Sequence, residues 1–347
     1  MVNLQKYQGK INEGLNKAHA SAISMARPLD DVRLIVLSDQ HKGMRDGADD
    51  FQQCENAYLG ALSYYLAEGF TLAVLGDVEE LWENEADPIL KSYSPVLHAE
   101  KDFNLVGRYW RFYGNHDDDW EHPDLANRTL GPILGEVTVW ESLRLSLQRG
   151  DQPLGEVFLA HGHQGTTFSD RYGALSRRFV RHCWRPLQRI TKIKTSTPAT
   201  DWQLRHAHDV AMYNWAADKS RLILIAGHTH HGVFPSPRRI ERLSSALHDL
   251  RELSMDSPEA LSLQAELAAA RAQEKPCYFN GGCCSFSDGQ VTGMEIAEGQ
   301  IRLVQWMMRE GKASRAILDS ADLAEVFEKS KSRAAPIMLD SAQDSGR

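Results

Sequence analysis

Short apolar runs recur along the chain, and each one ends at polar residues. The stretch "LIVLSDQHKG" (34–43) leads four aliphatic residues into Asp39 and His41, and "TLAVLGD" (71–77) ends at Asp77. Runs of this length, bounded by glycine or polar residues, predict buried strands. Four further segments share the pattern: "RYWRFYG", "VTVWESLRLSLQ", "EVFLAHG" and "RLILIAG".

A helical pattern separates the first two strands. Between Asp50 and Glu68 apolar residues recur at helical spacing, and Gly69 supplies a stop signal. Residues 34–77 therefore predict a strand–helix–strand unit, and in open α/β sheets ligands bind at the carboxyl ends of such strands. Near the end of the chain, "VTGMEIAEG" and "QIRLVQW" predict a hairpin that turns at Glu298 and Gly299.

Two longer segments interrupt this alternation. Residues 170–215 contain the run "RYGALSRRFVRHCWRPLQRITKIK", which has no Asp or Glu and spaces arginines along a helix-like pattern. Residues 240–275 place leucines on one helical face and restart at Ser257 and Pro258, a serine cap followed by a proline at the first helical position. We predict helical insertions at both places.

Composition favours a single large domain of a soluble enzyme. The chain has 347 residues, of which 42% are hydrophobic and 25% charged. No apolar run approaches the roughly 20 residues that cross a bilayer, and the opening segment has no signal-peptide pattern, so we expect a cytoplasmic protein with at most peripheral membrane contact. Five cysteines without paired C-x-x-C spacing predict buried thiols. A net charge of −8 argues against a nucleic-acid partner.

Candidate metal ligands follow five of the predicted strands. One Asp-x-His or Gly-Asp after a strand is a common turn, but five such strand ends in one chain indicate a function. Oxygen and imidazole donors without thiolates suit Mn, Fe, Zn or Ni, and seven donors are too many for one ion that keeps an open position. Two ions that share a carboxylate are typical of phosphoester and phosphoanhydride hydrolysis. The seven donors are Asp39, His41, Asp77, Asn115, His161, His228 and His230.

The ordered motifs "SDQH", "GD", "GNHD", "AHGH" and "GHTH" resemble those of the calcineurin-like metallophosphoesterases over residues 32–308. The resemblance implies an α/β fold, a four-layer αββα sandwich, with a pair of divalent ions, of which manganese is the first expectation. It implies that His116 is catalytic rather than a ligand, and that a hydroxide between the ions attacks phosphorus. The implied ligands are Asp39, His41 and His230 for one ion, Asn115, His161 and His228 for the other, and Asp77 as the bridge.

The same resemblance sets the expected domain organisation. Residues 1–31 would form an N-terminal extension, residues 32–308 the metallophosphoesterase domain with insertions at 170–215 and 240–275, and residues 309–347 a C-terminal tail. "GDVEELWE" after the second strand resembles the bacterial UDP-2,3-diacylglucosamine diphosphatase branch, which has a helical lid at the place of 170–215. His163 stands where that branch usually has an acidic residue.

The expected partner is a phosphorylated small or amphipathic molecule. Guanidinium groups match phosphate oxygens, so we predict that Arg177, Arg181 and Arg185 bind substrate together with His163. The alternatives are a UDP-2,3-diacylglucosamine diphosphatase-type pyrophosphatase, a nuclease of the same superfamily, or a scaffold that keeps the fold without the chemistry. A nuclease would need a broad basic groove, and a scaffold would tolerate loss of a ligand. All seven donors and His116 are present.

Overall fold

The computed structural model describes residues 4–47, 49–166, 202–235, 258–272, 275–334 and 336–337, together with 243, 244 and 247. Two sheets form the centre of the molecule. The seven-stranded sheet has the order β13-β12-β11-β2-β3-β4-β5, and the six-stranded sheet has the order β1-β6-β7-β8-β10-β9. The strands of the larger sheet are β2 (Arg33–Leu37), β3 (Thr71–Leu75), β4 (Tyr109–Phe112), β5 (Val139–Trp140), β11 (Val291–Ala297), β12 (Gln300–Arg309) and β13 (Lys312–Asp322). Those of the smaller sheet are β1 (Ile23–Pro28), β6 (Ser142–Arg149), β7 (Gln152–Ala160), β8 (Leu222–Ala226), β9 (Gly232–Val233) and β10 (Tyr278–Gly281).

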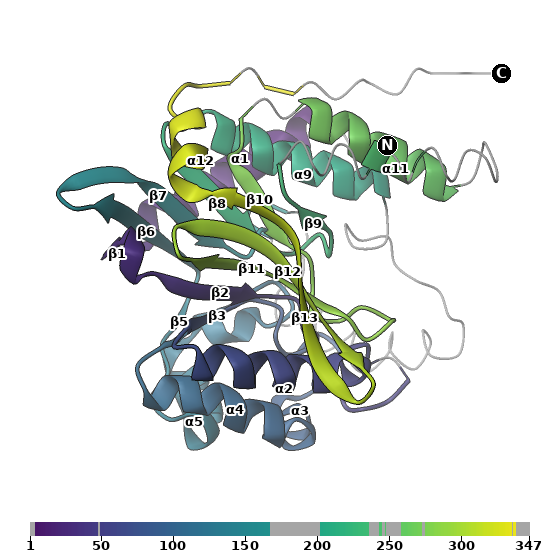
Figure 1. Ribbon diagram of the computed structural model, residues 1–347. Helices are drawn as coiled ribbons and strands as arrows, with labels where there is room; N and C mark the ends of the chain where they lie inside the picture. Colours follow the sequence, from purple (N-terminus) through teal and green to yellow (C-terminus); the bar gives the residue numbers. More distant parts are fainter. Residues whose placement is uncertain are drawn as a thin grey trace.

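Helices cover the outer face of each sheet (Figure 1). One layer, against the seven-stranded sheet, contains α2 (Phe51–Ala67), α3 (Ala86–Ser92), α4 (Ser94–Leu105) and α5 (Pro123–Leu134). The opposite layer contains α1 (Leu4–Ser21), α9 (Trp202–Ala217) and α11 (Pro258–Ala272), and α12 (Leu323–Lys329) packs at the edge between the sheets. Short 3-10 turns span Leu29–Asp31 and Asp118–Glu121.

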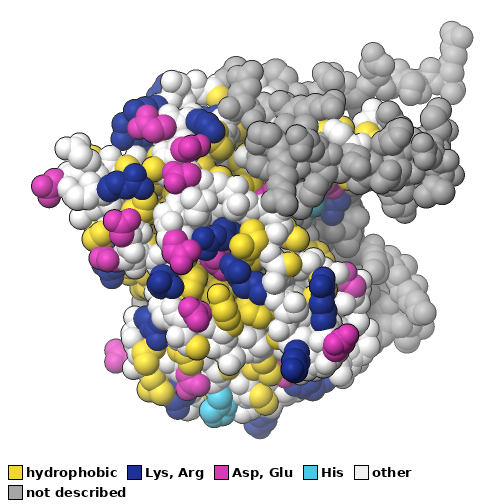
Figure 2. Space-filling model, viewed as in Figure 1, with side chains coloured by type: hydrophobic (Ala, Val, Ile, Leu, Met, Phe, Trp, Pro, Cys, Tyr) yellow, Lys and Arg dark blue, Asp and Glu magenta, His cyan; other side chains and the backbone are white. Residues whose placement is uncertain are grey.

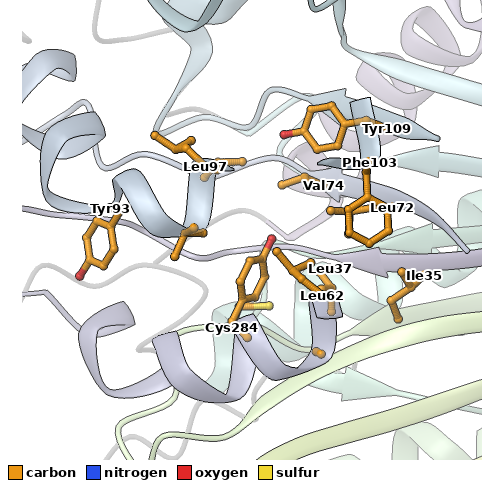
Figure 3. Packing of buried hydrophobic residues seen from close by; sticks show 14 of the residues in the cluster. Ile35, Leu37, Leu62, Leu72, Val74, Tyr93, Leu97, Phe103, Tyr109 and Cys284 are labelled. Carbon is orange, nitrogen blue, oxygen red and sulfur yellow. The ribbon is translucent and has the colours of Figure 1, made fainter. Parts of the chain in front are cut away.

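The alternation of side chains along β2 explains these layers. Leu34 and Val36 belong to the apolar cluster between the two sheets, whereas Ile35 and Leu37 pack under the outer helices. Successive strand residues face opposite sides, so a continuous aliphatic run suits a strand covered on both faces. Figure 3 shows the outer cluster, in which Leu62 of α2 and Leu97 of α4 meet the strands.

The four-layer α/β sandwich predicted from the sequence is confirmed. The helix expected at 50–68 is α2, and the hairpin turns at Glu298 and Gly299, both with positive φ. The second half of the predicted 240–275 insertion is α11, which begins at Pro258 as expected. Cys54, Cys277, Cys283 and Cys284 are buried, whereas Cys183 lies outside the described residues.

Three segments extend beyond the boundaries expected from the sequence. β1, within the expected N-terminal extension, pairs with β6 of the six-stranded sheet. β13 continues the other sheet past residue 308, where the domain was expected to end. Residues 202–215, assigned to the lid, belong to α9, whose face with Ala207, Ala211 and Trp215 is buried against α1 and the sheet. The rest of the expected lid lies outside the described residues.

Surface charge is mixed on the face shown in Figure 2, where basic and acidic side chains alternate over the described residues. Within the same described part of the chain, every helix is too short or too polar to cross a bilayer.

Candidate metal centre

Neighbouring parallel strands place the acidic candidate ligands next to one another. β2, β3 and β4 are neighbours, and the loops that follow them continue to pair: Asp39 N–H donates to Gly76 O (3.1 Å) and His41 N–H to Asp77 O (2.9 Å). Asn115 follows β4 at the same edge. His161 and His228 follow β7 and β8 of the other sheet. The five strands therefore present candidate ligands at their carboxyl ends, the edge at which α/β sheets bind ligands.

The backbone at this site is unusual. Nine described non-glycine residues have positive φ, and five of them are predicted ligands: Asp39, His41, Asp77, His228 and His230. Non-glycine residues in the left-handed region are uncommon, and strained backbone of this kind clusters at functional sites. All five residues lie within four positions of the end of β2, β3 or β8.

Two motif glycines are required for the close approach of these loops. A Cβ on Gly114 would lie 2.1 Å from Oδ1 of Asp77, and one on Gly227 would lie 2.4 Å from Oδ2 of Asp39. Both contacts are far shorter than real Cβ contacts. The Gly-Asn-His and Gly-His motifs therefore owe their glycine to packing against a carboxylate.

The first group of donors contains Asp39, His41 and His230. His230 Nε2 lies 3.3 Å from Oδ1 of Asp39 and 3.0 Å from Nε2 of His41. One ligand atom from each residue lies within 4.8 Å of the others. Such separations suit a common ion held at about 2.0–2.2 Å from each donor. Asp39 is oriented by the backbone N–H of His228, which donates to both carboxylate oxygens.

The second group contains Asp77, His161 and His228, again within 4.8 Å. His161 Nδ1 donates to the carbonyl of Leu75 (2.7 Å), so in the neutral ring Nε2 is unprotonated and faces Asp77 Oδ2 at 3.2 Å. A hydrogen bond of this kind fixes the tautomer of a metal-ligating histidine. His41 Nε2 lies 3.7 Å from the same Asp77 oxygen, so Asp77 lies between the two groups.

Unpartnered buried atoms test whether these residues fit metal ions. Within the described part of the chain, Oδ1 of Asn115 and Nε2 of His228 are buried without a hydrogen-bond partner. Leaving a buried acceptor unpaired costs about 1–3 kcal/mol, so native proteins usually satisfy such atoms. Both atoms belong to predicted ligands. The oxygen and imidazole donors here therefore fit divalent metal ions.

Buried carboxylates and imidazoles at this site shift one another's pKa values. Burial raises the pKa of Asp77, but the imidazoles of His161 and His116 outweigh it and hold that pKa well below its usual value. Burial lowers the pKa of His161, and the carboxylates of Asp77 and Asp39 outweigh it and raise the pKa to about 9. A buried cluster that holds anions and cations this close is typical of functional sites.

His116 is held from two directions. Its Nδ1 lies 2.7 Å from Oε2 of Glu80, and its ring stacks on Trp82 with centroids 4.1 Å apart. Glu80 also contacts Nδ1 of His41 at 3.1 Å. Burial lowers the pKa of His116, but Glu80 and Asp77 raise it to about 9. One ligand atom from each of His116, His41 and Asp77 also lies within 4.8 Å of the others.

Sequence reasoning assigned no role to Glu80 or to Asp117. Asp117 accepts hydrogen bonds from the backbone N–H groups of Asp77, Val78 and Gly114, and so fixes the two loops relative to each other. Burial and the nearby Asp77 and Glu79 raise its pKa to about 7. The only sequence signal for either residue was the run of acidic residues in "GDVEELWE" and "GNHDDD".

The predicted substrate-binding residues divide into two sets. His163 is buried beside His161, with ring centroids 5.4 Å apart, and its Nδ1 has no hydrogen-bond partner among the described residues. Burial lowers its pKa to about 3, so the ring is neutral. Arg177, Arg181 and Arg185 lie outside the described residues.

Comparisons with known proteins do not assign a function to this chain. No family model and no curated protein matches the sequence. Among solved structures, the fold is similar to Vacuolar Protein Sorting 29 from Cryptosporidium parvum, with a TM-score of 0.31 and 12% identity over 84% of this chain and 98% of that chain. A single mutant of Vps29 from Entamoeba histolytica gives a TM-score of 0.24 and 12% identity over 83% and 100% of the two chains.

Proposed function

We propose that this protein is a metallophosphoesterase: a phosphohydrolase that uses two divalent ions to cleave a phosphoester or phosphoanhydride. The convergence of two donor groups on Asp77 is the observation that supports the proposal most strongly. Two ions held this way would lower the pKa of a bound water and neutralise charge on the phosphoryl oxygens.

The chain's own residues would divide the remaining tasks. Asp39, His41 and His230 would hold one ion, and Asn115, His161 and His228 the other. Asp77 would bridge them, because a carboxylate between two cations reduces their mutual repulsion.

His116 would act as the acid. Its Nδ1 contacts Glu80, so Nε2 is the nitrogen that can meet a substrate, and the Glu80 carboxylate stabilises the protonated ring. A protonated imidazole can donate to the leaving-group oxygen. The stacked Trp82 limits rotation of the ring.

A narrower assignment, to amphipathic substrates with an anionic head, depends on the arginines of residues 170–201 and stays a prediction. His163, a neutral imidazole beside the metal ligands, is its proposed contact within the described residues. Manganese is the proposed native metal.

A reconstitution assay tests the proposed function. The protein is stripped with a chelator, loaded with Mn²⁺, Fe²⁺, Zn²⁺ or Ni²⁺, and assayed on a phosphomonoester, a phosphodiester and a nucleotide-sugar pyrophosphate. We expect metal-dependent turnover of at least one class and little turnover by an Asp39→Asn variant. A protein that binds two ions yet turns over none of the three classes would instead support the scaffold alternative.

A further inference from the structure

The N-terminal helix α1 packs against the strand that leads to a metal ligand. It precedes every residue of the proposed centre, yet Ile11, Leu15 and Ala18 are fully buried in one cluster with Phe158 and Ala160 of β7. His161 follows Ala160 directly. Any movement of α1 would therefore reach the end of β7 through packed side chains.

Backbone contacts bring α1 directly onto the turn after His161. A Cβ on Gly14 would lie 2.5 Å from the amide nitrogen of Gly165, and one on Gly165 would lie 2.0 Å from the carbonyl oxygen of Lys10. The two glycines are thus needed for helix and turn to touch. Gly165 also has a φ of +77°, which a side chain would disfavour.

Two buried hydrogen bonds continue from α1 to the centre. The hydroxyl of Tyr7 lies 2.8 Å from Nδ1 of His208, and Nε2 of His208 lies 2.8 Å from the carbonyl oxygen of Gly162. A carbonyl can only accept, so His208 donates through Nε2–H, and in the neutral ring Nδ1 accepts from Tyr7. Burial lowers the pKa of His208 to about 4, which keeps the ring neutral.

The carbonyl that receives this bond lies between two ligand loops. Gly162 separates His161 from His163, and a Cβ placed on it would lie 3.4 Å from Cβ of His228. The His208 ring is 5.0 Å from the His228 ring. A change at His208 would therefore displace His161 and His228 together, and it would reach Asp39 only through the backbone N–H of His228.

We propose that Tyr7 and His208 are positioning residues through which α1 holds His161 and His228 in place for metal binding. The proposal rests on the metal centre proposed above. It gives the N-terminal segment a role in the function of the site, because the partners that orient metal ligands affect metal affinity as well as stability.

The test compares Tyr7→Phe and His208→Ala with Asn16→Ala in the full-length chain. Asn16 also joins α1 to α9, by accepting from Trp215 Nε1 at 2.9 Å, but it is not part of the Tyr7–His208–Gly162 chain. Amide hydrogen exchange of residues 158–166 is measured in the metal-free protein, and Mn²⁺ affinity by calorimetry. Thermal unfolding gives the stability loss of each variant.

We expect faster exchange in both Tyr7 and His208 variants, and an Mn²⁺ dissociation constant that rises about 10-fold for His208→Ala and less for Tyr7→Phe. Asn16→Ala should lower the Tm without either effect. Exchange and affinity equal to those of Asn16→Ala would overturn the proposal, and Tyr7→Phe decides alone where His208→Ala does not fold. A parent protein without Mn²⁺ affinity would refute the metal centre, whereas the exchange data would still test the role of α1.

Discussion

The two halves of the proposed metal centre are supported by different chemistry. Beneath the loops of the seven-stranded sheet lie four charged residues with no solvent exposure: Lys42, Glu79, Glu100 and Arg111. Lys42 Nζ contacts Glu100 at 2.9 Å, and Arg111 pairs with both Glu79 and Glu100. Beneath the six-stranded sheet, the ligand loop at His161 is supported by the neutral Tyr7–His208–Gly162 hydrogen bonds.

This difference follows from what each half holds. Lys42 and Glu79 belong to the paired loops that present Asp39, His41 and Asp77, and they join the two loops through an isolated bridge. Buried ion pairs give little net stability, but removing one partner is costly. The half supported by these buried ion pairs, beneath the seven-stranded sheet, is therefore expected to be rigid and intolerant of substitution. In the half that the six-stranded sheet supports through neutral hydrogen bonds, substitutions should reduce metal affinity before they unfold the protein.

The largest effect is expected where the two halves meet. Asp77→Asn removes the charge that faces both His41 and His161, while it keeps the side-chain volume. At least one ion should be lost, and turnover should fall more than 100-fold, since even outer partners of metal ligands are worth about 10–100-fold. Metal content by mass spectrometry, measured beside activity, checks this. Full metal content and activity in the variant would exclude a bridging role.

The next effect separates catalysis from metal binding. His116→Gln should keep both ions and reduce turnover by about 10²–10⁴-fold, with the smallest loss for substrates that have good leaving groups. Rates for a series of aryl phosphates, together with metal content, provide the measurement. A variant that loses metal instead would make His116 a ligand in the group with His41 and Asp77.

Substitution in the charged half should destabilise the fold. Glu100→Gln leaves Lys42 and Arg111 with less compensating charge, so we expect a loss of about 3–5 kcal/mol in the free energy of unfolding. Denaturant unfolding measures it. Glu325→Gln, which removes an exposed pair with Lys329, is the matched control and should change little. Equal effects of the two substitutions would show that the buried network does not stabilise the fold more than an exposed ion pair does.

The remaining prediction concerns pH and needs no substitution. His161 must lose its proton to bind metal, and its pKa is raised to about 9. Metal affinity should therefore rise between pH 6 and pH 9, by up to about tenfold per unit for each proton displaced. In the metal-free protein the sign is opposite: the stability from protonated His161 is complete below about pH 6.5 and is lost as the pH rises through about 9. Calorimetric titrations at several pH values test both trends. Affinity that is constant over this range would contradict the assigned ligand.

Strand ends were predictable from the sequence because β2 and β3 are covered on both faces. Their sequences are therefore unbroken aliphatic runs, and each run stops where the strand ends. The motif order likewise predicted which residues converge, since Asp39 and Asp77 follow adjacent parallel strands. The partners of these residues were not predictable. Glu80 and Asp117 act through contacts with residues about 40 positions apart, and His208 meets Tyr7 across 201 positions. No local pattern encodes such pairings.

The position of α9 was missed for a related reason. Its segment follows the basic run, and an insertion was favoured because the run is long for a loop. Ala207, Ala211 and Trp215 face a surface created only when α1 packs on the six-stranded sheet. Short-range periodicity predicts the helix without showing which partner covers it.

Anomalous diffraction from crystals of the Mn²⁺-loaded protein tests the central claim most directly. We predict two anomalous peaks about 3.5–4 Å apart, one on each side of the Asp77 carboxylate. The first should contact Asp39, His41 and His230, and the second should contact Asn115, His161 and His228. A single peak, or two peaks that do not share Asp77, would contradict a bridged binuclear centre.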